Sequence, residues 1–208
     1  MDDSGIPQEG FALYSWIGVS DDGATAAERC WLDFRAELHE DLGVPVDYEM
    51  HAHKFISGRG RPGGANPTKS DRRRAAQRAL DTIAGLPGVS VGCVYVRQPY
   101  RSATPRKAAF DGLLRTLDRL LSEHGCDGRV IIDGDGTDPM YGDRHFDLEP
   151  ECIPAAPTAV PAHESTWIQM ADLVAYTACH AIARNPDREF MWHWYTRHLP
   201  KAEGPVSV

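Results

Sequence analysis

The chain has 208 residues, of which 42% are hydrophobic and 25% are charged, and its formal net charge is −8. These ordinary globular proportions exclude collagen-like and disordered chains, and a typical domain size of roughly 150 residues predicts a single domain. The five cysteines are scattered without a C-x-x-C pair, unlike a disulfide framework or a structural zinc site. The chain has no run of about 18 apolar residues, and its acidic start does not resemble a secretory signal. We therefore expect a cytoplasmic protein without a membrane span.

Hydrophobic patterning at the start of the chain predicts two strands around one helix. Residues 11–20 have the composition of a largely buried strand. A capping box beginning at Thr25 predicts the start of a helix, which ends at Gly43. Residues 44–50 have the pattern of a short strand that carries Glu49.

The middle of the chain continues this alternation of helices and strands. A helix capped by Ser70 is expected to place its arginines outward, and residues 89–96 form a β-branched, apolar strand. Pro105 begins another helix with a strong leucine stripe, which ends at Gly125. A short buried strand follows at 129–133.

The last third of the chain holds a Pro-rich stretch, residues 150–161, and a long helix from Ser165 to Arg184. This helix is apolar almost all round, a pattern typical of a helix in the interior of a domain. The aromatic segment 190–195 is expected to pack over the core rather than to stack nucleic-acid bases. Interleaved strands and helices predict an α/β or mixed α+β domain.

The acidic net charge hides a strongly basic segment. Between Lys54 and Arg78 lie eight basic residues and one acid, the basic ones being Lys54, Arg59, Arg61, Lys69, Arg72, Arg73, Arg74 and Arg78. A smaller basic group follows the next predicted strand and consists of Arg97, Arg101, Arg106 and Lys107. Such clusters can bind phosphates whatever the global charge, although a solvated helix face has the same composition.

Asp172 lies in the middle of the apolar final helix, where an ionised carboxylate is costly unless another group pairs with it. One interpretation is a salt bridge to a buried arginine or a cap on another element. The other interpretation is a metal ligand or a catalytic acid.

Asp133 ends the strand at 129–133, where α/β sheets tend to place ligand-binding groups. The run that begins there resembles a calcium-binding loop but fails at its sixth and twelfth positions, Asp138 and Arg144. We interpret it as a strand end that turns into a loop.

Glu49 stands close to two histidines, and strand alternation would put Glu49, His51 and His53 on one face. Neutral imidazoles are good zinc ligands, which makes a zinc hydrolase one alternative. The other interpretation is a carboxylate-and-histidine face that works near phosphates.

Four short acidic segments form a recognisable set. They are Asp2-Asp3-Ser4-Gly5, Glu49, the strand end Val130-Ile131-Ile132-Asp133, and Gln169-Met170-Ala171-Asp172-Leu173. Together they resemble the family called domain of unknown function 3800, whose signature begins Asp-Glu-Ser-Gly, so Asp3 replaces the usual glutamate. The resemblance extends from residue 2 to about residue 184.

That family is similar to a branch of the ribonuclease-H-like fold. The resemblance implies a mixed central sheet flanked by helices over residues 1–186, followed by an aromatic helix and a short flexible tail over 187–208. It also implies a metal-dependent nuclease acting on DNA or RNA, in which the ligands of two Mg²⁺ or Mn²⁺ ions are Asp2, Glu49, Asp133 and Asp172. Two such ions roughly 4 Å apart activate water and stabilise the leaving oxygen. Before metal binds, repulsion among the acids should raise some of their pKa values.

The remaining candidates are supporting residues, namely Asp3, His51, Lys54 and Gln169. His51 and His53 are interpreted either as ordinary strand histidines or as groups that contact phosphate or carry protons. Gln169 is expected to orient a metal-bound water or to satisfy backbone groups. Arg72, Arg73 and Arg74 are expected to hold a nucleic-acid backbone in a salt-sensitive way. The alternative function is a catalytically inactive ribonuclease-H-like module that binds nucleic acid or protein, because little sequence precedes Asp2 to build a full first strand.

Overall fold

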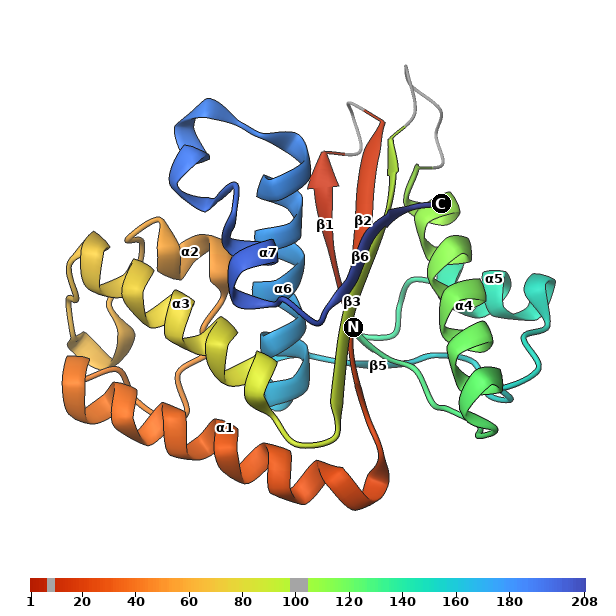
Figure 1. Ribbon diagram of the computed structural model, residues 1–208, viewed down its shortest axis with the longest axis horizontal. Helices are drawn as coiled ribbons and strands as arrows, with labels where there is room; N and C mark the ends of the chain where they lie inside the picture. Colours follow the sequence, from red (N-terminus) through yellow and green to blue (C-terminus); the bar gives the residue numbers. More distant parts are fainter. Residues whose placement is uncertain (7–9, 98–104) are drawn as a thin grey trace.

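A mixed β-sheet runs through the middle of the structure, with helices on both of its faces (Figure 1). The computed structural model describes residues 1–6, 10–97 and 105–208, so Arg101 of the second basic group lies outside the described residues. The sheet has the order β1-β2-β3-β6, formed by Asp2–Ile6, Phe11–Val19, Val89–Arg97 and Glu203–Ser207. Strands β1, β2 and β3 pair antiparallel, whereas β6 runs parallel to β3. The predicted mixed sheet flanked by helices is therefore confirmed.

A second, two-stranded parallel sheet joins the first one next to β1. It consists of β4 (Ile131–Asp133) and β5 (Thr158–Val160). The Met1 nitrogen donates to the Ile131 carbonyl at 2.7 Å, and the Asp133 amide donates to the Met1 carbonyl at 3.3 Å. These two bonds flank Ile132 as in a parallel strand pair. They bring the end of β4 beside the start of β1, and so bring Asp133 to Asp2.

The helices form two layers, one on each face of the sheet (Figure 1). One layer contains α1 (Asp21–Leu42), α2 (Ala52–Ile56), α3 (Lys69–Gly85), α6 (Thr166–Ala183) and α7 (Trp194–His198). The other layer contains α4 (Pro105–His124) and α5 (Met140–Leu148). Short 3₁₀ helices occur at Pro62–Gly64, Ala162–Glu164 and Pro186–Met191.

Strand β2 is apolar along most of its length because it is covered on both faces. Leu13 packs into the core beneath α1, α3 and α6, whereas Tyr14 and Trp16 pack into the core beneath α4. Helix α6 lies against β1 and β2 with most of its residues buried, as its apolar pattern predicts. In the described part of the chain no helix is long and apolar enough to cross a membrane.

Several predicted boundaries agree with the structure. The strands predicted at 11–20 and 89–96 are β2 and β3. Gly43 ends α1 in the left-handed conformation with a φ of 68°, and Ser165 caps α6 through a bond from the Ile168 amide. Each of these features depends on residues within about one helical turn or one strand, so the local sequence is enough to predict it.

Two predicted helix starts are wrong. Helix α1 begins after Ser20, whose hydroxyl accepts from the Gly23 amide, rather than at Thr25. The acids Asp21 and Asp22 lie in its first turn, where negative charge favours a helix.

Helix α3 is capped by Thr68 rather than by Ser70. Its capping box is completed by Asp71, whose side chain accepts from the Thr68 amide at 3.3 Å. The pattern of the capping box was therefore present in the sequence two residues earlier than predicted.

The strand predicted at 44–50 is absent, and this segment is a loop with a turn. Pro45 carries no backbone donor, and the carbonyls of Pro45 and Tyr48 accept instead from the buried Arg35 guanidinium at 3.0 and 2.6 Å. Glu49 therefore lies on a loop, and strand alternation does not align it with the histidines that follow.

The C-terminal segment differs from the predicted flexible tail. Residues 203–207 form β6 in the central sheet, and the Tyr195 hydroxyl donates to the Glu203 carbonyl at 2.8 Å. Trp194 and Tyr195 are 3% and 1% exposed, so the aromatic segment packs on the core as expected. Local patterning did not predict β5, β6 or α5.

Candidate functional site

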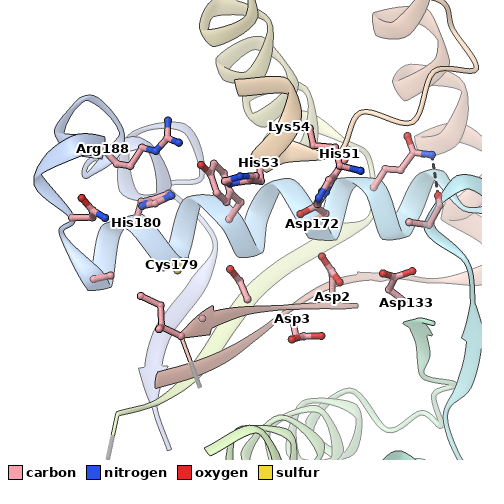
Figure 2. A pocket seen from close by; sticks show the side chains of 18 of the residues that line it. Asp2, Asp3, His51, His53, Lys54, Asp133, Asp172, Cys179, His180 and Arg188 are labelled. Atoms are coloured by element: carbon pink, nitrogen blue, oxygen red, sulfur yellow. Dashed lines mark hydrogen bonds and ion pairs between the residues drawn. The ribbon is translucent and has the colours of Figure 1, made fainter. Parts of the chain in front are cut away.

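A cavity of about 690 Å³ opens between β1 and α6. The loop before α2, helix α2 itself, the end of β4 and the segment after α6 complete its walls. All four carboxylates predicted as metal ligands line it, namely Asp2, Glu49, Asp133 and Asp172. Figure 2 shows Asp2, Asp133 and Asp172 grouped at one end, with Asp2 on β1 directed toward Asp172 on α6.

A buried hydrogen bond between β2 and α6 fixes this arrangement. Ser15 pairs with Asp2 across the β1–β2 ladder, and its hydroxyl donates to the Ala171 carbonyl at 2.7 Å. Because Ala171 directly precedes Asp172, the bond holds the two carboxylates on facing elements. Ser15 was missed in the sequence, where it is one small residue within an apolar strand.

Asp2 experiences the strongest electrostatic perturbation in the acidic group. Burial raises its pKa well above the usual value, and the charges of Asp172, Asp3 and Asp133 raise it further. This is the repulsion predicted for acids that share a site without a cation. Asp3 lies on the opposite face of β1, as strand alternation requires (Figure 2).

Asp172 caps another element and also pairs with a histidine. Its Oδ2 accepts from Nδ1 of His51 and from the amide of Ala52, both at 2.8 Å. The Ala52 bond satisfies a free amide at the start of α2. The pKa of His51 is raised, mainly by its hydrogen bond to Asp172. Within the described residues Oδ1 of Asp172 makes no hydrogen bond, which leaves it available to a ligand.

Among the acids that line the cavity, Glu49 and Asp133 are exposed, as is Asp3. Glu49 lies on the loop that Arg35 anchors, directly before the start of α2. Asp133 ends β4, and Gly134 follows it with a φ of 149°, which begins the predicted turn. Glu49 therefore comes from a loop and Asp133 from the end of a strand, and tertiary packing brings them together.

Gln169 contacts protein groups rather than open space. Its Oε1 accepts from the Met50 amide at 3.4 Å and from Arg35 at 3.5 Å, and its Nε2 donates to the Ala162 carbonyl at 3.0 Å. Of the two expectations, it satisfies backbone groups and so holds the loop that carries Glu49. Lys54 is exposed on α2 and lines the same cavity.

The three consecutive arginines of α3 do not form one phosphate-binding surface, which corrects the prediction. Arg72 is 0% exposed, and its guanidinium donates to the carbonyls of Pro67, Arg59 and Gly60. Arg73 stacks over the Phe190 ring at 3.7 Å, and Arg74 pairs with Asp71 at 2.6 Å. Consecutive helix residues point roughly 100° apart, so three in a row cannot share one face.

Sequence reasoning missed Tyr176, His180 and Arg188, which line the other end of the cavity together with His53. The Tyr176 ring packs edge-on against His53 at 5.7 Å and against His180 at 4.5 Å. A signal was present in the sequence, because Asp172, Tyr176 and His180 recur every four residues and so share a helix face.

The chemistry of the donor set fits a hard dication. Asp2, Asp133 and Asp172 meet at one end of the cavity, and carboxylate oxygens are the ligands that such a cation prefers. The pKa of Asp2 is raised first by burial and then by the charges of the neighbouring acids. In the described ranges, however, no three His, Cys, Asp or Glu side chains have the arrangement of a formed metal site. The strand face proposed for a zinc site does not exist, since His51 precedes α2 and His53 lies within it.

Comparisons with protein-family models, with curated proteins and with solved structures found no match to this chain.

Proposed function

We propose that this chain is a divalent-metal-dependent nuclease with a ribonuclease-H-like fold. The observation that carries the proposal is the meeting of Asp2, Asp133 and Asp172, from β1, β4 and α6, at one end of a cavity. The mixed sheet with helices on both faces supports the fold assignment. The first acid lies on the first strand and the last acid on the late buried helix, as the resemblance to domain of unknown function 3800 implies.

Asp2, Asp133 and Asp172, with Glu49 at the exposed side, are the residues that would hold two Mg²⁺ or Mn²⁺ ions. When bound, such ions supply an activated water and stabilise the leaving oxygen of a phosphodiester displacement. His51 and the Ala52 amide hold Asp172 through Oδ2, so Oδ1 would be the oxygen that holds a metal. Burial and the neighbouring acids raise the pKa of Asp2, and a bound dication would favour the ionised carboxylate.

A second candidate is a catalytically inactive module of the same fold that binds nucleic acid. The observation in its favour is that the acids, as placed in the described chain, do not form a closed metal site. Such a module would bind an oligonucleotide equally well with and without Mn²⁺.

The deciding experiment is a calorimetric Mn²⁺ titration of the wild type beside Asp172→Asn, which keeps the shape and removes the charge. We expect about two ions per chain for the wild type and much weaker binding for the variant. The control is Asp143→Asn, an exposed carboxylate on α5, which should bind as the wild type does. Cleavage of labelled single-stranded DNA and RNA is then measured with Mn²⁺. Absence of Mn²⁺ binding by the wild type would overturn the nuclease proposal.

A further inference from the structure

The cavity has two ends of opposite charge. The carboxylates occupy one end, whereas Arg188 and His180 lie at the other, with His53 of α2 between them and Lys54 beside His51 near the carboxylates (Figure 2). Among the described residues that line the far end, none is acidic. One cavity thus offers a site for cations and, separately, a site for an anion.

A hydrogen bond holds Arg188 in place, but among the described residues no carboxylate pairs with its charge. It is partly buried, and its guanidinium donates to the Ser57 hydroxyl at 2.9 Å, a neutral partner at the end of α2. Neither Arg188 nor Lys54 has a carboxylate partner within the described part of the chain. A partly buried cation without a counter-charge is unfavourable, and an anionic ligand in the cavity would remove that cost.

The two histidines beside Arg188 neither neutralise its charge nor add to it at neutral pH. Burial lowers the pKa of His180 to about 4, and the charges of Arg188 and His53 contribute to this shift. The pKa of His53 is lowered as well, first by burial and then by Arg59 and Arg188. At neutral pH both imidazoles are uncharged and can donate or accept hydrogen bonds beside the guanidinium.

The separation of the two ends determines what kind of ligand reaches both. Asp172 and His180 are eight residues apart on α6, which is about 12 Å at 1.5 Å per residue. Along one strand of a duplex, phosphates recur roughly every 3.4 Å of axial rise. A single phosphate group therefore cannot contact both ends, but a strand of several nucleotides can.

We propose that Arg188, with His53, forms a second phosphate subsite, which binds a backbone phosphate a few nucleotides away from the scissile bond. This inference rests on the proposed nuclease function and deepens it. The substrate is an extended nucleic-acid strand, and small phosphodiesters or mononucleotides engage only the carboxylate end.

The first test measures binding without catalysis. A fluorescein-labelled single-stranded oligonucleotide, as DNA and as RNA, is titrated with protein in EDTA at several salt concentrations, and binding is followed by fluorescence anisotropy. Arg188→Gln should weaken binding about tenfold and reduce the slope of log K against log salt by about 0.7, the value for one phosphate contact on a single strand. The control Arg115→Gln removes the same charge from the exposed surface of α4 and should bind as the wild type does.

The second test separates failure of this inference from failure of the proposed function. With Mn²⁺, Arg188→Gln should raise KM for the oligonucleotide about tenfold while kcat changes little, and should leave cleavage of bis(p-nitrophenyl) phosphate unchanged. If the wild type cleaves the oligonucleotide and Arg188→Gln does so with the same KM, the second subsite is overturned and the nuclease proposal stands. Lack of oligonucleotide binding by the wild type in EDTA would also overturn the subsite. Lack of Mn²⁺ binding would overturn the nuclease itself.

Discussion

Nδ1 of His51 lies 2.8 Å from Oδ2 of Asp172, a contact between residues 121 positions apart in the chain. The same oxygen accepts from the Ala52 amide, so one carboxylate orients the histidine and caps α2. The bond raises the pKa of His51 above that of a free histidine. The acidic end of the cavity therefore has a charge arrangement that depends on pH.

Asp172→Asn should lower the pKa of His51, which can be followed by NMR titration of its ring protons. A histidine whose folded pKa is raised stabilises the protein below its unfolded pKa of about 6.5 and loses this contribution as pH rises through the folded value. The variant should therefore lose more free energy of unfolding at about pH 5 than at about pH 8. Since His51 is 40% exposed, solvent screening keeps the pH-dependent part below about 1 kcal/mol.

The control for this prediction is Asp143→Asn, which removes an exposed carboxylate from α5. Urea denaturation at both pH values should give the same stability change for that variant. An unchanged His51 titration in Asp172→Asn would show that the contact does not form in solution.

Gly5→Ala should destabilise β1 and with it the acidic group. Gly5 has a φ of 137°, which other residues rarely adopt, and a Cβ there would lie 2.5 Å from the Phe11 carbonyl oxygen. Strain and steric overlap predict a loss of about 2 kcal/mol in the free energy of unfolding. Mn²⁺ affinity should fall in parallel, because Asp2 is held by the same strand.

The matched control is Gly85→Ala, in α3, where an added Cβ meets nothing within 4 Å. Alanine is the better helix former there, so stability should stay the same or increase by up to about 1 kcal/mol. If both alanine variants were equally stable, the backbone of β1 would not require glycine.

Arg72→Ala should destabilise the protein, whereas Arg74→Ala should not. Removal of the buried guanidinium leaves the carbonyls of Pro67, Arg59 and Gly60 without their donor, at a cost of about 3 kcal/mol. Arg74 is exposed and forms a surface ion pair worth less than about 1 kcal/mol. Thermal and urea denaturation would distinguish the two roles, and equal effects would contradict the structural assignment of Arg72.

The lowered pKa of His180 predicts that the protein loses stability in mild acid. Its folded pKa is about 4, whereas an unfolded histidine titrates near 6.5, so only the unfolded chain takes up this proton between the two values. The free energy of unfolding should therefore fall as pH falls from about 6.5 to about 4. His180→Gln should flatten this dependence, since glutamine does not titrate.

The exposed His124→Gln on α4 is the control and should keep the pH dependence of the wild type. Arg188→Gln should raise the pKa of His180, because the guanidinium charge contributes to its lowering. A His180 that titrates near 6.5 in the folded wild type would contradict the burial of its ring.

The sequence by itself determined the elements whose signals are local. The apolar runs of β2 and β3, the helix stop at Gly43, the cap at Ser165 and the all-round apolar pattern of α6 depend on neighbouring residues. The acids were also noticed in the sequence, because a carboxylate inside an apolar helix or at a strand end conflicts with its surroundings. Periodicity and capping act over one or two turns, so no tertiary information was needed.

Only the tertiary structure decided which side chains act together. Arg35 shapes the loop at 44–50 by binding its carbonyls, and Arg72 is buried although it lies in a run of charged residues. Residues 203–207 become a strand because β3 offers them a free edge. The His51–Asp172 bond and the Arg188–Ser57 bond likewise join distant segments. Such contacts arise from the packing of whole elements, which local periodicity does not specify.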